Sequence, residues 1–192
     1  MARSKEFEVS EVLDKAMNLF WELGYEKTSM SDLVEKMGIH RRSIYDTFGD
    51  KRSLFIQAMD RYCNKVETAL SKKIITNTAR EAIEIILHFM IVDEEGKPSG
   101  CLIVNSSTEL AAHDLDVDTK SVESFITTEE LFQKIIIWGQ QNEEFSSDLD
   151  AKEMAEYLNA LSIGVRVMAR TSISKEKLNN LVNTSIRLLK GY

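Results

Sequence analysis

The side chains with the clearest possible chemistry open a short predicted helix: His40, Arg41, Arg42 and Ser43. Arg41 and Arg42 fall in its first turn, where the positive end of the helix dipole repels cations and favours Asp or Glu. An anion outside the chain is therefore expected to compensate them. Arginine can bind the two acceptors of a guanine edge or hold a phosphate, and both roles stay open here.

The residues around this segment predict two helices joined by a tight turn. Ser29 and Asp32 fit the S-x-x-D capping box of a helix start, and Gly38 ends that helix. The next helix covers residues 39–48, and Gly49 follows it. A pair of this kind is a helix-turn-helix, whose second helix enters the major groove of DNA.

Helical spacing of apolar residues continues along the chain and predicts an all-α protein of about nine helices. Ser147 and Asp150 provide another S-x-x-D helix start. We expect a DNA-binding domain over residues 1–50, a connecting helix over 51–73 and a second helical domain over 74–192. Besides the two helices above, the predicted helices cover residues 9–23, 50–71, 78–92, 100–113, 118–142, 150–170 and 174–190.

Composition limits the class of protein. The 192 residues include 43% hydrophobic residues, one Pro and a net charge of −7, so a compact helical protein is expected and a broad cationic surface is not. Residues 1–52 carry a charge of −1, which leaves room for a local DNA footprint. Two cysteines without a zinc pattern, and no apolar run of signal or membrane length, predict a cytoplasmic protein.

The first ~70 residues combine glycine, apolar and polar residues in one register, which are Phe20, Gly24, Tyr25, Thr28, Ser29, Asp32, Leu33, Gly38, Ile39, Ser43, Ile44, Tyr45, Phe48, Lys51 and Leu54. In this combination the segment resembles the DNA-binding domain of the TetR (tetracycline repressor) family of bacterial transcriptional regulators. Val34, Met37 and Asp46 depart from the family pattern. The resemblance implies that Thr28, Tyr45 and Lys51 contact phosphates.

The same resemblance implies a set of DNA-contacting residues in which the start of the second helix is nearest the bases. It gives no base for any of them. If the segment were only part of a helical bundle, Arg41 and Arg42 would be solvated surface charges. The implied set is Thr28, Ser29, His40, Arg41, Arg42, Ser43, Tyr45 and Lys51.

Members of this family use the C-terminal domain to form a dimer, so the last two helices are the expected interface. Two helical hairpins would form a four-helix contact. The alternative is that these apolar stripes face the core of their own domain. The candidate residues are Ala155, Leu158, Leu161, Ser162, Val165 and Met168, with Leu178, Leu181, Val182, Ser185 and Leu188.

The resemblance also implies an effector pocket in the middle of the C-terminal domain. Asn105, Glu109 and His113 share one helix face, which is either part of that pocket or a solvated stripe. Cys101 precedes a helix start, where a thiolate is favoured, or is a small buried apolar residue. The candidates are Phe89, Met90, Cys101, Leu102, Asn105, Glu109, His113, Phe125, Phe132 and Trp138.

We therefore expect a homodimeric repressor that binds a palindromic operator in double-stranded DNA. A small-molecule effector or a thiol-reactive species would release it by favouring a conformer with the wrong spacing of the two reading helices. No cofactor, metal or membrane partner is expected. An enzyme in a helical bundle and a transcriptional activator are the alternatives.

Overall fold

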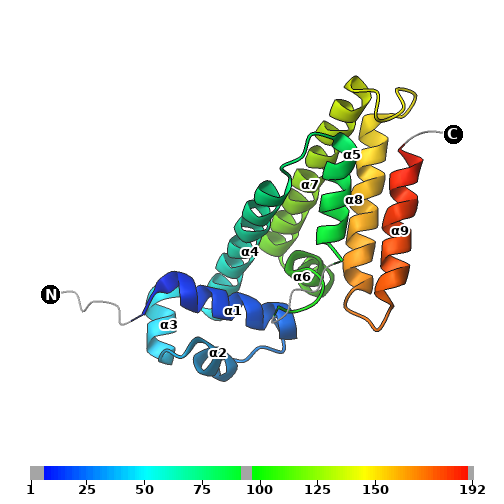
Figure 1. The fold of residues 1–192 in the computed structure, drawn as a ribbon. Coiled ribbons are helices and arrows are strands. Elements are labelled where there is room, and N and C mark those ends of the chain that lie inside the picture. The colour runs from blue at the N-terminus through cyan, green and yellow to red at the C-terminus, as the bar shows by residue number, and fades with distance from the viewer. Residues whose placement is uncertain (1–6, 92–96, 190–192) are drawn as a thin grey trace.

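The structure is a computed structural model that describes residues 7–91 and 97–189. This part of the chain contains nine α-helices and no strand, in agreement with the predicted all-α fold (Figure 1). The helices are α1 (Val9–Leu23), α2 (Met30–Met37), α3 (Arg41–Phe48), α4 (Lys51–Lys73), α5 (Ala79–Phe89), α6 (Leu102–Leu110), α7 (Leu115–Gln141), α8 (Ala151–Met168) and α9 (Lys175–Leu188).

Helices α1 to α3, which contain the predicted helix-turn-helix and are called the reading module below, are built from local signals. The Ser29 hydroxyl accepts a hydrogen bond from the Asp32 amide at 3.1 Å, and the Asp32 carboxylate accepts from the Ser29 amide at 2.8 Å, which confirms the capping box. Gly38 ends α2 with φ +71°, a conformation that only glycine adopts without strain. Because His40 is extended, α3 begins at Arg41, two residues later than predicted.

The start of α7 differs from the prediction. Asp114 caps this helix by accepting hydrogen bonds from the amides of Asp116 and Val117 at 3.1 and 3.2 Å. The helix therefore begins at Leu115 instead of residue 118. Helices α5 and α6 are also shorter than predicted, and the predicted ends of the helices over 78–92 and 174–190 lie outside the described residues.

The predicted S-x-x-D start at Ser147 is wrong. Asp150 is itself the cap of α8 and accepts hydrogen bonds from the Lys152 and Glu153 amides at 2.8 and 3.0 Å. The side-chain amide of Gln140 donates to two carbonyls of the preceding segment, at 2.9 and 2.8 Å. These bonds hold that segment as a turn, so no helical turn can form from Ser147.

Two apolar clusters form the core of the described chain. The first joins α1 to α4 with the start of α6, and in it the rings of Phe20 and Phe55 meet edge to face at 5.1 Å. The second cluster joins α5, α7, α8 and α9 around Phe132. Figure 1 shows α6 in the angle between α1 and the upper helices, with α8 and α9 along the outer edge. Helix α6 is thus placed to connect the two parts.

Candidate nucleic-acid interface and effector cavity

Helix α3 presents two different faces. Its inner face is apolar, and Ile44 and Phe48 are buried as the predicted i, i+4 pair. This anchoring leaves the other side of α3 to solvent, where Tyr45 is 43% exposed. The predicted base-proximal residues lie at this end of α3, with Ser43 partly buried and the other three exposed: His40, Arg41, Arg42 and Ser43.

The N-terminus of α3 is not capped by a side chain. His40 occupies the cap position but makes no side-chain hydrogen bond to the following amides. Unsatisfied amides and the helix dipole make such an end suitable for a phosphate. The sequence signal for this uncapped end is His40 at a position where Ser, Thr, Asp or Asn would normally stand.

The cations of α3 have only weak internal partners. The Arg42 Nε atom lies 3.6 Å from an Asp46 carboxylate oxygen, with side chains 91% and 68% exposed, so this pair contributes little to stability. Arg41 lies over the Tyr45 ring, with a long contact of 3.5 Å between its Nη2 atom and the Tyr45 hydroxyl. Both guanidinium groups can therefore turn to an external anion.

The other three residues predicted to contact DNA, Thr28, Ser29 and Lys51, differ in their exposure. The Thr28 side chain is fully buried and donates a hydrogen bond to the Gly24 carbonyl at 2.6 Å. It stabilises the turn after α1, and its predicted phosphate contact is inconsistent with this burial. Ser29 is exposed at the start of α2, and Lys51 is partly buried with its Nζ atom 4.2 Å from the centre of the Tyr25 ring.

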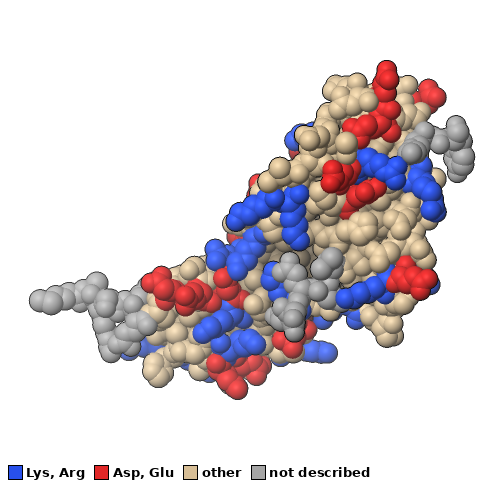
Figure 2. Space-filling view, viewed as in Figure 1, with Lys and Arg blue, Asp and Glu red and all other residues tan. Residues whose placement is uncertain are grey.

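Cations on other helices are already used within the molecule. Figure 2 shows Lys and Arg side chains gathered where Figure 1 places α4. In this helix Arg61 and Lys65 contact Asp14 of α1 at 2.8 and 2.7 Å. Burial alone would raise the pKa of Asp14, but hydrogen bonds from Arg61 and Lys65 lower it below its usual value. This cluster therefore holds α1 against α4.

Glu109 links α6 directly to the reading module. Its carboxylate oxygens accept hydrogen bonds from the backbone amides of Tyr25 and Glu26 at 3.0 and 2.8 Å. A Cβ atom at Gly24, which has φ +87°, would lie 2.8 Å from the same carboxylate. The prediction of Glu109 as a pocket residue is wrong, because this side chain is used to hold the turn after α1.

Two arginines strengthen the contact between the reading module and the C-terminal helices, which is called the junction below. Arg170, after α8, donates to the backbone carbonyls of Trp21 and Glu22 at 3.3 and 3.1 Å. Arg52 of α4 binds Asp114 with two hydrogen bonds of 2.9 Å and also contacts Asp116. The hydrogen bond from Arg52 lowers the pKa of Asp114. The reading module is therefore connected to α6, α7 and the end of α8.

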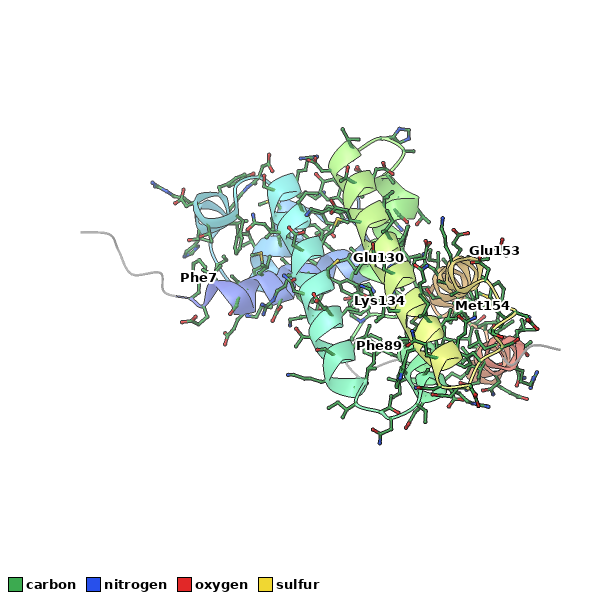
Figure 3. All side chains as sticks on the ribbon, turned by 90° about the horizontal axis from the view of Figure 1, so that it is seen from above. Phe7, Phe89, Glu130, Lys134, Glu153 and Met154 are labelled. Carbon is green, nitrogen blue, oxygen red and sulfur yellow. The ribbon has the colours of Figure 1, made fainter. Side chains whose placement is uncertain are left out.

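Two cavities lie next to this junction. The larger has a volume of about 510 Å³ and is lined from α4, α5, α7 and α8, and the smaller has about 150 Å³. Figure 3 shows Glu130 and Lys134 of α7 and Phe89 of α5 along the gap between α4 and α7. Of the predicted pocket residues, Phe89 lines the smaller cavity, Cys101 the larger one, and Met90 both.

The remaining predicted pocket residues do not line either cavity. Leu102 and Phe132 are fully buried in the first and second apolar clusters, and Phe125 and Trp138 pack against these clusters. His113 is exposed beyond the end of α6. The side-chain nitrogen of Asn105 is buried without a hydrogen-bond partner. Helical spacing correctly put Leu102, Phe125, Phe132 and Trp138 near the core but could not distinguish packing from a cavity wall.

Cys101 is buried, but its surroundings are not purely apolar. An Nη1 donor of Arg166 lies 3.2 Å from the Cys101 sulfur. Burial raises the pKa of Cys63 to about 11, so this second thiol stays protonated at neutral pH. Burial also raises the pKa of Tyr62 well above its usual value. Sequence reasoning missed Arg166, because an Arg on an amphipathic helix is normally a surface charge.

The predicted dimer stripes lie mostly inside the domain. The described chain alone already buries Ala155, Leu158, Ser162 and Val165 of α8 and Leu178, Val182 and Ser185 of α9. Leu161, Met168, Leu181 and Leu188 are partly buried. The prediction is therefore wrong for the buried seven, since α5 and α7 cover the apolar faces of α8 and α9 that the sequence pattern assigned to a partner.

Two further features, a membrane-spanning helix and a metal-binding cluster, are absent from the described residues. None of their helices combines the length and apolar character needed to cross a bilayer. Within residues 7–91 and 97–189, no group of three or more His, Cys, Asp or Glu side chains has an arrangement that could hold a metal ion.

Known proteins with similar sequences are regulators. Residues 12–58 match the family described as bacterial regulatory proteins, tetR family, and residues 80–184 match the tetracyclin repressor-like C-terminal domain. The HTH-type transcriptional repressor ComR of Escherichia coli is 30% identical over 97% of this chain and 90% of its own length. The HTH-type transcriptional regulator YezE of Bacillus subtilis is also 30% identical, over 98% of this chain and 100% of its own.

A solved structure agrees with these matches. A cysteine-substituted form of the TetR family regulator CifR, complexed with 26-base-pair operator DNA, is 26% identical and has a TM-score of 0.86. The alignment covers 98% of this chain and 100% of the CifR chain. Family models for both halves, relatives matched over nearly their whole length and the shared fold lead to one conclusion. The chain belongs to the TetR family of bacterial regulatory proteins and is a transcriptional regulator, not an enzyme.

Proposed function

We propose that this regulator is a homodimeric repressor that binds a palindromic operator through α3 and leaves it when an effector occupies the cavities at the junction. The observation that carries the proposal is the outer side of α3, where two arginines with weak internal partners flank uncapped backbone amides. The chain has a net charge of −7, so it can bind DNA only through a local cationic surface of this kind. The name of ComR and the DNA complex of CifR support repression at an operator.

The proposed DNA contacts follow from exposure. Bases are read by the N-terminal side chains of α3, of which Arg41 and Arg42 carry the charge. Phosphates are held by the free amides of α3 and by Ser29, Tyr45 and Lys51. Thr28 is omitted because it is buried. The proposed location is the bacterial cytoplasm, because a regulator of this type acts on the chromosome.

The proposed dimer face is the exposed side of α8 and α9. On α8 an exposed stripe at helical spacing includes Tyr157 and Val167, which are 42% and 46% exposed, with Ala160 and Gly164 between them. A Cβ atom added at Gly164 would meet nothing within 4 Å, so a partner helix has room to approach closely there. Leu161 and Met168 lie beside this stripe. A pair of such hairpins would space two α3 helices for successive major grooves.

The proposed release mechanism uses α6. One end of this helix is next to the Arg166 contact of Cys101, and the other end carries Glu109, which holds the amides of Tyr25 and Glu26. A ligand that displaces Cys101 would therefore move the turn after α1 and change the orientation of α3. An effector with higher affinity for that conformer weakens operator binding through linkage.

A thiol-reactive species is the second candidate effector. The 3.2 Å contact between Arg166 and the Cys101 sulfur favours it, because a neighbouring guanidinium stabilises a thiolate. Cys63 is not a candidate for this role, since its raised pKa of about 11 keeps it as a thiol.

The operator proposal is tested with the pair of variants Arg41→Ala and Arg42→Ala. An operator is first selected from random duplexes with the parent protein, and affinities are then measured by fluorescence anisotropy. Each substitution is expected to weaken binding about 5- to 100-fold, because a specific arginine contact contributes ~1 to 3 kcal/mol. The melting temperature is expected to stay within about 1 °C of the parent value.

Arg80→Ala is the matched control, because Arg80 is exposed and paired with the residue one turn later, like Arg42. It should bind operator as the parent does. If both α3 variants also keep the parent affinity, or if the parent protein selects no palindrome, the assignment of α3 is wrong.

The dimer face is tested with Gly164→Arg. The new side chain meets open space in one protomer but would block a second helix, so sedimentation velocity should show monomers at concentrations where the parent is dimeric. Thr119→Arg, at an exposed position of α7, is the control and should remain dimeric. A dimer of unchanged stability in Gly164→Arg would place the interface elsewhere.

A further inference from the structure

Arg166 of α8 is a partly buried cation that lines both cavities. Its one hydrogen bond is to the Cys101 sulfur, and no carboxylate in the described chain lies within ion-pair distance of it. Guanidinium groups removed from water are normally paired with an anion. Within residues 7–91 and 97–189, the cavity wall thus carries a positive charge without a carboxylate counterion.

A second unsatisfied donor lines the smaller cavity with Arg166. Trp21 of α1 is 9% exposed, and its indole Nε1 is buried with no hydrogen-bond partner in the described residues. Indole and guanidinium groups only donate hydrogen bonds. A molecule that satisfies both must therefore provide acceptor oxygens, and a negative charge would also compensate Arg166.

The larger cavity provides space for an apolar group. Its walls include Met59, Leu70, Ile74, Ile86 and Leu131, and its volume of about 510 Å³ is within the range of small-molecule sites. Arg166, Tyr62, Val66 and Met90 line both cavities, so the cation lies where they meet.

The other two cations of the larger cavity, Lys120 and Lys134, already have carboxylate partners, and the exposed Glu67 and Glu123 also line this cavity. Lys120 pairs with Asp60, and Lys134 lies 4.0 Å from Glu130, the two residues of α7 labelled in Figure 3. These pairs leave Arg166 as the cation of the described cavity wall that still needs a counterion.

We infer that the two cavities form one site for a carboxylate with an apolar body. The carboxylate binds the Arg166 guanidinium and accepts a hydrogen bond from the Trp21 indole, and the apolar body fills the larger cavity. This inference rests on the proposed function for its regulatory meaning. Trp21 belongs to α1, so this ligand would contact the reading module itself as well as α4, α5 and α8.

The experiment uses octanoate as the probe and 1-octanol as its neutral counterpart with the same chain. Binding to the full-length protein is measured by calorimetry without DNA. The parent is expected to bind octanoate at least about tenfold more tightly than 1-octanol, because a charged hydrogen-bonded pair distinguishes the two. Arg166→Met should reduce octanoate affinity to the level of 1-octanol without weakening 1-octanol binding.

Two further variants keep the result interpretable. Trp21→Phe retains the ring but removes the N–H group, and it should weaken octanoate binding about threefold to tenfold. It also serves as the test if Arg166→Met does not fold. Arg80→Met is the control for the loss of an arginine and should bind octanoate like the parent. Melting temperatures verify that each variant is folded.

Three results would overturn the inference. These are equal affinities of the parent for octanoate and 1-octanol, parent-like octanoate binding in Arg166→Met or in Trp21→Phe, and no binding by any straight-chain carboxylate from butanoate to dodecanoate. Operator binding is measured separately. Octanoate binding in a protein that selects no operator would support the site and contradict the proposed function, while an operator affinity insensitive to octanoate would show a carboxylate site that is not an effector site.

Discussion

Helix α3 and the junction around the turn after α1 are two sides of the same reading module, and they differ in how they use polar groups. On α3 the charged side chains are exposed and the first amides lack a side-chain cap. At the junction, carboxylates and guanidinium groups already make hydrogen bonds within the molecule, such as that of Glu109 with the Tyr25 amide. One side is therefore available to an external anion, while the other fixes the orientation of the module.

The largest effect is expected from shortening a buried side chain on the inner face of α3. Ile44 is fully buried, and Ile44→Ala should lower the free energy of unfolding by about 2–4 kcal/mol through loss of packing and cavity formation. Urea denaturation measures the change. Ile75→Ala removes the same atoms from a residue that is 83% exposed and should have little effect. Equal stability of the two variants would contradict the anchoring of α3 by its inner face.

A smaller effect is expected from loosening the junction. Glu109→Gln removes a charge that accepts two backbone hydrogen bonds and should cost about 1–2 kcal/mol of stability. Hydrogen exchange should become faster at the amides of Tyr25 and Glu26. Glu130→Gln, at an exposed position with a weak ion pair, is the control. Unchanged exchange at both amides would show that Glu109 does not hold this turn.

The smallest effect is expected on the pH dependence of stability, through the ion pairs of Asp14. The pKa of Asp14 is lower in the folded chain than its usual value of 3.8, so Asp14 stabilises the fold above about pH 5, and this contribution is lost as the pH falls through the folded pKa. Asp14→Asn should therefore lower stability by up to about 1 kcal/mol near pH 6 and have less effect near pH 3. Urea denaturation at both pH values tests this, with exposed Asp148→Asn as the control. A destabilisation that does not depend on pH would exclude the ion-pair explanation.

The existence of the helices, and those of their ends that carry a glycine or a capping side chain, could be predicted because these signals are local. Gly24, Gly38 and Asp50 fix the ends of helices wherever the rest of the chain lies. Ser147 failed as a cap because the competing hydrogen bonds of Gln140 come from another helix. Hydrogen bonds between distant segments have no counterpart in a local pattern.

The sites were harder to predict for the same reason. Periodicity identified the apolar faces of α8 and α9 but not the neighbours that cover them, so residues such as Leu158 were assigned to a partner subunit instead of the core. The alignment of Asn105, Glu109 and His113 was correct only up to the end of α6. Arg166 could not be recognised, because its burial depends on which distant segments α8 meets in the fold, such as Cys101 at the start of α6.

Arg170 and Glu109 hold main-chain atoms in the last turn of α1 and in the turn that follows it. Arg170 binds carbonyls, and Glu109 binds amides, which every amino acid except proline supplies. Exchange of side chains in this segment would leave both sets of hydrogen bonds intact, provided that a glycine remains at position 24. These contacts therefore do not depend on the sequence of the segment that they hold. DNA-binding domains of different operator preference could be exchanged between relatives while the C-terminal domain stays the same.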